Sequence, residues 1–225
     1  MKSRIVVFAP HPDDETLGCG GTIARRISEG YEVQIAILTD GRNAFLASFG
    51  IESEPTPSEL KDIREAEVKR ATKILGVIEG SLFFLGFEDG TLSQNRSQAK
   101  EKVSNILSGN APAEVYFTYE KDLNMDHRVT SRMVRDSIKE LGLETRDYRY
   151  SIEQKQPRAV PSLGNFFNKS RDSVIRVDIS RFLPLKKKAL GEFRSQIEII
   201  SRMQRRPVVD GIDRFLKEEE SFFIR

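Results

Sequence analysis

The chain has 225 residues, 38% of them hydrophobic and 31% charged, a composition typical of a folded globular protein rather than a disordered one. It carries 36 Lys and Arg against 34 Asp and Glu, and a net charge of +2 gives no indication of a nucleic-acid-binding protein. Cys19 is the single cysteine, which excludes an internal disulfide and is consistent with a reducing compartment.

Strands and helices are predicted to alternate through the first 142 residues. Continuous apolar runs predict strands at residues 5–8, 33–38, 82–85 and 115–119. Apolar positions at helical spacing predict helices at residues 16–29, 58–76, 98–107 and 127–141, the second between an N-cap at Ser58 and a stop at Gly76. This alternation is typical of βαβ units, so we expect a Rossmann-like α/β fold with a mostly parallel sheet of strand order 3-2-1-4-5.

The pattern changes after Gly142. Strands are predicted at residues 148–152 and 174–179, a largely helical segment at 181–205 and a short helix at 211–220. The lysine run at 186–188 is interpreted as a solvent-exposed helix face. Because no repeat or linker interrupts the chain, residues 1–225 are predicted to form one domain, in which residues 143–225 are a C-terminal extension that completes the core of residues 1–142.

The apolar run nearest the N-terminus extends only from Ile5 to Ala9. A signal peptide needs an apolar stretch of about 7–15 residues, and a membrane-spanning helix needs about 18 or more. We therefore expect a cytoplasmic protein without a membrane span.

The two histidines of the chain follow two different predicted strands. His11 lies after the first strand in the segment HPDDE (residues 11–15), and His127 lies after the fourth strand. Strands 1 and 4 are neighbours in a sheet of order 3-2-1-4-5, and ligands bind in the crevice at their carboxyl ends. Both histidine loops are therefore expected to open into one crevice.

His11, Asp14 and His127 then form a set of two imidazoles and one carboxylate. Three protein ligands with a fourth position open to water are typical of catalytic zinc, whereas structural zinc has four protein ligands. Asp13, beside a ligand, is a candidate general base that takes a proton from water. Asp126 is a candidate to hold His127, or another polar group, through a hydrogen bond.

Two alternatives remain for the N-terminal motif. The acidic residues before Thr16 could cap the following helix. Gly18, Gly20 and Gly21 follow a strand, as in a dinucleotide-binding loop, but their spacing does not match G-x-G-x-x-G. The neighbouring carboxylates would also repel a pyrophosphate, so these glycines, with Cys19 as a small buried residue, more simply permit close packing.

Residues 9–22, APHPDDETLGCGGT, resemble the signature of the PIG-L/LmbE-like deacetylases. In that family, zinc enzymes remove an N-acyl group, usually acetyl, from an amino sugar. The resemblance covers most of the chain. It extends to LTDG at 38–41, Arg64-Glu65, DHR at 126–128, KAL at 188–190 and Ser195-Gln196.

The resemblance implies that His11, Asp14 and His127 bind one zinc ion per chain and that Asp13 is the general base. It also implies that Arg64 binds substrate near the metal; the alternative is an exposed cation that pairs with neighbours such as Glu67. Asp89 is a candidate sugar contact, with a turn-forming Asp-Gly pair as its alternative.

The chain departs from the family at residues 124–127, which read Asn-Met-Asp-His. Many members have a histidine where this chain has Asn124, and that histidine is thought to stabilise the oxyanion or to protonate the leaving amine. Asn124 can donate a hydrogen bond to an oxyanion but has no suitable proton to transfer. The general acid is therefore unassigned, and Asp13 returning its proton is the simplest option.

We thus expect a zinc-dependent hydrolase that releases acetate from a small N-acetylated amino sugar or conjugate. The alternatives are a metal-dependent hydrolase of another amide or ester, and a non-catalytic module that binds a sugar or nucleotide. No nucleic-acid or membrane partner is expected, and a homo-oligomer is left open. Four phenylalanines in predicted loops could line a sugar-binding wall, form a subunit contact or simply anchor the loops: Phe45, Phe49, Phe166 and Phe167.

Overall fold

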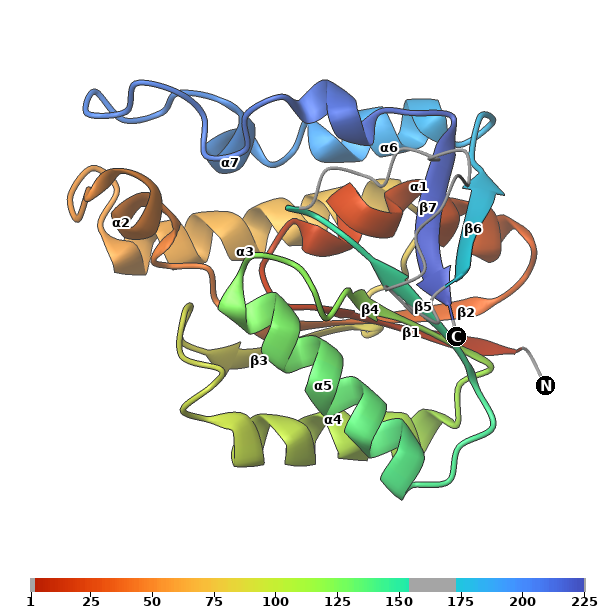
Figure 1. The fold of residues 1–225 in the computed structure, drawn as a ribbon. Coiled ribbons are helices and arrows are strands. Elements are labelled where there is room, and N and C mark those ends of the chain that lie inside the picture. Colours follow the sequence, from red (N-terminus) through yellow and green to blue (C-terminus); the bar gives the residue numbers. More distant parts are fainter. Residues whose placement is uncertain (1–2, 154–172, 225) are drawn as a thin grey trace, which may run out of the picture.

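A seven-stranded sheet lies at the centre of the computed structural model, which describes residues 3–153 and 173–224 (Figure 1). The strands are β1 (Arg4–Ala9), β2 (Glu32–Thr39), β3 (Leu82–Phe87), β4 (Glu114–Thr118), β5 (Arg146–Tyr150), β6 (Ser173–Asp178) and β7 (Glu219–Ile224). Their order is β3-β2-β1-β4-β5-β7-β6, in which β1 to β5 are parallel and β7 is antiparallel to β5 and β6. The predicted α/β fold and its strand order 3-2-1-4-5 are confirmed.

Helices cover both faces of this sheet. They are α1 (Asp14–Ser28), α2 (Ala44–Phe49), α3 (Pro57–Ile74), α4 (Arg96–Asn110), α5 (Met125–Glu140), α6 (Leu183–Leu190), α7 (Arg194–Ile197) and the 3-10 turn η1 (Ile212–Phe215). In Figure 1, α4 and α5 lie below the sheet, and α1, α3 and α6 lie above it. Within the described ranges, no helix is both long and apolar enough to cross a membrane.

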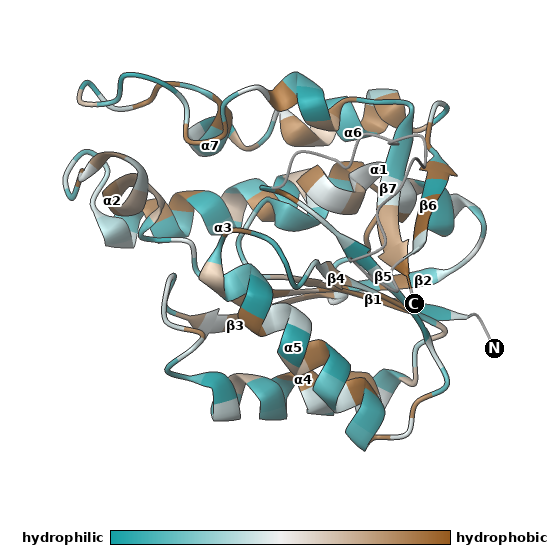
Figure 2. Cartoon of the chain, in the orientation of Figure 1, coloured by the Kyte–Doolittle hydropathy of each residue, from teal (hydrophilic) through white to brown (hydrophobic). Residues whose placement is uncertain are grey.

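The central strands are buried on both faces, as their continuous apolar runs predict. In β1, Ile5 and Val7 belong to the core under α1, α3 and α6, whereas Val6 and Phe8 belong to the core over α4 and α5. Figure 2 shows these strands brown between helices that carry their teal residues outward. This alternation of sides follows from the two-residue period of a strand.

The start of α3 differs by two residues from the prediction. Its N-cap is Thr56 rather than Ser58, and Thr56 forms a capping box with Glu59, whose carboxylate accepts a hydrogen bond from the Thr56 backbone N–H at 2.9 Å. Pro57 takes the first helical position, where the missing N–H costs no hydrogen bond. Pro57 therefore indicates the start of α3 better than Ser58 does.

Two predictions for the C-terminal part are wrong. The segment predicted as helix at 181–205 is helical only in α6 and α7, because the backbone leaves the helical conformation at Phe193 (φ −84°, ψ 52°) and again at Glu198, which is extended. Residues 211–220 form η1 and the start of β7 instead of a helix. Strand β7 is stabilised by tertiary contacts, since Phe222 packs edge-on against the rings of Tyr116 and Tyr148. These long-range contacts override the local helical pattern.

Helix α1 is broken at Cys19, whose backbone is non-helical (φ −144°, ψ 22°). A buried ion pair supplies the hydrogen bonds that the break removes. Glu220 accepts hydrogen bonds from the backbone N–H groups of Gly21 and Thr22, at 2.9 and 2.7 Å. Lys186 donates to the backbone oxygen of Leu17 at 2.9 Å and to Glu220 at 2.6 Å. The pair therefore caps both new helix ends.

Residues 186–188 were predicted to form a solvent-exposed helix face, and for Lys186 this prediction is wrong, because Lys186 is 1% exposed. Lys187 and Lys188 are exposed as predicted. The glycines of α1 pack closely, as predicted. A Cβ atom at Gly18 would collide with the ring of Tyr150, and one at Gly21 would collide with Ile179. Cys19 is fully buried.

Lys186→Met should destabilise the protein by about 3–5 kcal/mol, because it leaves the Glu220 carboxylate buried without a cation. The free energy of unfolding is measured by urea denaturation. The matched control is Lys69→Met, which removes a half-exposed ion pair with Glu65 and should cost less than about 1 kcal/mol. Equal losses for the two variants would contradict this role of Lys186.

Candidate metal centre

The loop between β1 and α1 holds its acidic residues in a constrained backbone. The Asp14 carboxylate accepts a hydrogen bond from the backbone N–H of His11 at 3.0 Å. Asp13 takes the N-cap position of α1 with φ +139°, a conformation that L residues rarely adopt and that is often found at functional sites. Its side chain makes no capping hydrogen bond, so the capping alternative does not account for this carboxylate.

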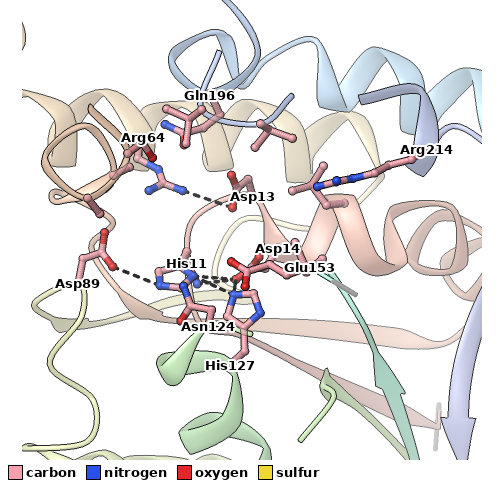
Figure 3. A pocket seen from close by; sticks show the side chains of 17 residues that line it. His11, Asp13, Asp14, Arg64, Asp89, Asn124, His127, Glu153, Gln196 and Arg214 are labelled. Carbon is pink, nitrogen blue, oxygen red and sulfur yellow. Dashed lines mark hydrogen bonds and ion pairs between the residues drawn. The ribbon is translucent and has the colours of Figure 1, made fainter. Parts of the chain in front are cut away.

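His11, Asp14 and His127 meet at one point, although His127 comes from α5. His11 Nδ1 lies 3.1 Å from Asp14 Oδ2 and 3.2 Å from His127 Nε2, and His127 Nε2 lies 3.2 Å from Asp14 Oδ2. Tetrahedral zinc with bonds of about 2.0 Å places neighbouring ligand atoms about 3.3 Å apart. The three atoms therefore fit three corners of a zinc site, and Figure 3 shows them converging below Asp13.

In each of the two imidazoles, the ring nitrogen that points away from the cluster lies near a carboxylate. His127 Nδ1 lies 2.9 Å from Asp122 Oδ2, and His11 Nε2 lies 3.2 Å from Asp89 Oδ1 and 3.6 Å from Asp126 Oδ2. Histidine ligands of zinc commonly donate their other ring N–H to a carboxylate in this way, which fixes the tautomer and the ring orientation.

Asp122 was not predicted as a partner of His127. Asp126 was the nearer carboxylate to His127 in sequence, but one step along a helix turns a side chain by about 100°. Asp126 instead accepts hydrogen bonds from the backbone N–H groups of Gly90 and Leu92, at 2.8 and 3.3 Å, on the His11 side. A carboxylate five residues before the histidine, at the end of β4, was the available signal for Asp122.

The electrostatics of the cluster favour a cation. Burial lowers the pKa of a histidine, yet the nearby carboxylates raise the pKa of His127 to about 9 and that of His11 well above its usual value. Burial would raise the pKa of Asp14, but His127 and His11 hold it below its usual range. These shifts reflect excess negative charge around two buried imidazoles, and a divalent ion on the three ligand atoms would balance it.

His11, Asp89 and Asp126 form a second group with metal-ligand geometry. Its carboxylates are already engaged by backbone N–H groups, Asp126 as described above and Asp89 by Asn43 at 3.2 Å. The two nitrogens of His11 also point to opposite sides, so ions on them could not approach the about 3.5–4 Å typical of two-metal hydrolases. Asp89 and Asp126 are therefore better suited to orient the His11 ring than to bind a second metal ion.

Arg64 lies at the buried side of α3 and is 3% exposed, so the alternative of an exposed helix cation is wrong. It donates hydrogen bonds to the backbone oxygens of Gly41 at 2.9 Å and Pro12 at 2.7 Å, and lies 3.3 Å from Asp13 Oδ1. Burial raises the pKa of Asp13 to about 8, although Arg64 opposes the shift. The direct effect of Arg64 is therefore to position Asp13.

Asn124 is the N-cap of α5, and its side-chain oxygen accepts a hydrogen bond from the backbone N–H of Asp126 at 2.8 Å. This bond directs the oxygen to the helix and leaves the Nδ2 group as a donor. Asn124 lines the same pocket as His11 and His127 (Figure 3).

The pocket above these residues has a volume of about 230 Å³. Its outer wall comes from α2, α7, the segment before η1 and η1 itself, through Ala44, Ala47, Ser48, Gln196, Val208, Val209 and Arg214. Phe45 and Phe49 lie in helix α2 and not in loops, so their predicted location is wrong. Neither lines the pocket; Phe45 is 1% exposed and packs with Ile51 and Leu60. Phe166 and Phe167 lie outside the described residues.

A family model described as PIG-L, GlcNAc-PI de-N-acetylase, matches residues 6–138. Diacetylchitobiose deacetylase of Thermococcus kodakarensis is 29% identical over 199 residues, 86% of this chain and 70% of that protein. A probable N-acetyl-alpha-D-glucosaminyl L-malate deacetylase 2 of Bacillus cereus is 28% identical over 201 residues, 88% of this chain and 86% of that protein. N,N'-diacetylchitobiose deacetylase of Pyrococcus horikoshii has a similar structure, with a TM-score of 0.73, 22% identity and coverage of 99% of this chain and 84% of that chain.

Asp122→Asn should weaken zinc binding about 10- to 100-fold, because it removes the carboxylate that orients His127. The dissociation constant is measured by competition with a chromophoric chelator. Asp136→Asn changes an exposed aspartate of the neighbouring helix α5 and should leave zinc affinity unchanged. Unaltered affinity in Asp122→Asn would show that His127 needs no such support.

Proposed function

The chain belongs to the PIG-L family, and from this premise we propose that it is a zinc-dependent hydrolase that removes the N-acetyl group from an amino sugar or amino-sugar conjugate. The observation that carries the proposal is the triangle of His11, Asp14 and His127 atoms with Asp13 beside it in the same pocket. The names of the related deacetylases supply the substrate class. We propose that residues 1–225 act as one deacetylase domain.

His11 Nδ1, Asp14 Oδ2 and His127 Nε2 would hold the metal, while Asp89 and Asp122 orient the two imidazoles. Zinc at such a site would supply a Lewis acid and would lower the pKa of water to about 7. The pocket, of about 230 Å³, favours a small molecule or the end of a conjugate as substrate.

Asp13 is proposed as the general base. Its carboxylate lines the pocket, outside the group of three ligand atoms, and Arg64 holds it at 3.3 Å. Asp13 takes one proton from the attacking water as the water oxygen bonds to the acetyl carbon. It then returns that proton to the amide nitrogen as the C–N bond breaks, so that a free amine and acetic acid leave, and the acid ionises to acetate in water. Asp13 thereby serves as the general acid that Asn124 cannot be.

Asn124 is proposed to stabilise the oxyanion that develops on the acetyl oxygen. Its side-chain oxygen is engaged as the cap of α5, so the Nδ2 group is the one available to donate into the pocket. Arg64 and Asp89 act mainly through Asp13 and His11, because most of their polar atoms are already bonded to the protein.

A hydrolase of another amide or ester would use the same metal ligands and the same base, Asp13. A module that only binds a sugar would need the pocket but no general base. The constrained backbone of Asp13 and its contact with Arg64 favour turnover over binding alone. Cytoplasmic location stays a prediction.

The wild-type protein should release acetate from at least one N-acetylated sugar, sugar nucleotide or glycoside, and a chelator should abolish this release. Asp13→Asn should retain one zinc ion per chain and lose turnover about 100-fold or more, because the proton acceptor is gone. Acetate is measured by a coupled enzymatic assay and zinc by atomic absorption. Acetate release at the normal rate by Asp13→Asn contradicts the assignment of the base, and release unaffected by chelation contradicts the metal.

Asn124→Ser should lower kcat about 100-fold or more, because serine can still cap α5 but lacks the Nδ2 donor. An unchanged thermal unfolding midpoint would show that the cap is retained. The matched control is Asn95→Ser at the start of α4, outside the pocket, which should leave kcat unchanged. Wild-type kcat in Asn124→Ser would exclude the oxyanion role.

A further inference from the structure

The motif Ser195-Gln196 joins the C-terminal part of the chain to α3. Glu67 of α3 accepts two hydrogen bonds from Ser195, one from the backbone N–H at 2.8 Å and one from the hydroxyl at 2.6 Å. Gln196 Nε2 lies 2.8 Å from Ser195 Oγ. All three side chains are at most 2% exposed, so this is a buried chain of polar groups.

This chain of hydrogen bonds decides how the Gln196 carboxamide is oriented. Burial raises the pKa of Glu67, and its bonds to Ser195 and the charges of Arg64 and Arg70 oppose that rise. The two carboxylate oxygens of Glu67 each accept one hydrogen bond from Ser195, one of them from the hydroxyl, which thereby uses its single proton. Ser195 Oγ can then only accept from Gln196, which turns the Nε2 group to Ser195 and the Oε1 atom away from it.

Gln196 belongs to the wall of the pocket. The Gln196 side chain lines the pocket, and Figure 3 places it on the far side of Asp13 and Arg64 from His11 and His127. Within residues 3–153 and 173–224, no hydrogen bond engages Oε1, and it is not among the fully enclosed polar atoms without a partner. The backbone of Gln196 is also held, since its carbonyl accepts a hydrogen bond from Val209 at 2.8 Å.

We propose that Gln196 is a specificity-determining residue whose Oε1 atom accepts a hydrogen bond from a ring hydroxyl of the substrate sugar. The inference rests on the proposed deacetylase function. An acetamide bound between Asp13 and the metal ligands lies on the other side of Asp13 from Gln196, and the hydroxyls of the attached sugar ring extend beyond it. Because the buried chain holds the carboxamide, the acceptor is in place before the substrate arrives.

Gln196→Met tests this contact, since methionine is of similar length and lacks the acceptor. The substrates are the methyl glycoside of N-acetylglucosamine and its 3-, 4- and 6-deoxy analogues. With the parent glycoside, kcat/KM should fall about 10-fold in the variant. With the one analogue that lacks the bonded hydroxyl, wild type and variant should have equal kcat/KM, because the partner is already absent. The same comparison by titration calorimetry gives dissociation constants without turnover.

The matched control is Gln204→Met, which changes a buried glutamine of the same segment that does not line the pocket. It should affect all four glycosides equally or not at all. An equal loss on all four with Gln196→Met, or no loss, overturns the assignment of Gln196 while leaving the deacetylase function intact. If the wild-type protein neither binds nor deacetylates any of the four, the inference fails together with a function on simple amino sugars.

Discussion

The pairing of β1 with β4 is the contact on which the candidate site depends. The two strands are parallel neighbours with Ile5, Val6 and Val7 opposite Glu114, Val115 and Tyr116. Their carboxyl ends therefore deliver the loops that carry the two histidines to the same place, although the histidines are 116 residues apart in sequence. A different strand order, in which β1 and β4 were not neighbours, would separate the two imidazoles. The site therefore depends on the topology of the sheet.

Once these loops meet, the charge of the cluster becomes the second constraint. Carboxylates surround two imidazoles that are almost fully enclosed, and a bound cation or protons on the imidazoles would balance their charge. Elsewhere in the protein, buried charged side chains are paired with opposite charges from distant segments of the chain. Lys186 and Glu220 complete the broken helix α1, and Arg64 lies against Asp13. Helix α3 thus holds the acidic loop, and the C-terminal segment holds helix α1, which follows that loop. Residues 143–225 contribute in this way to a site whose candidate ligands all precede them.

Much of this architecture could be predicted from local patterns. Apolar runs located the central strands, and helical spacing located α1, α3, α4 and α5, because these elements are buried along their length and their sequences carry the corresponding period. Prediction failed where tertiary contacts override local preference. The first residues of β7 were predicted as the end of a helix, whereas in the structure Glu220 bonds to α1 and Phe222 packs in the core. Helix α2 was not predicted because six residues carry too little periodicity.

For the site, the two histidines and the expected strand order were enough to predict His11, Asp14 and His127 as a candidate ligand set, and the structure brings their ligand atoms together. The partners of these residues depended on the folded chain. Asp122 and not Asp126 contacts His127. Arg64 faces the interior and contacts Asp13. Ser195 and Glu67 orient Gln196. A hydrogen bond is set by direction and distance in space, and sequence separation specifies neither.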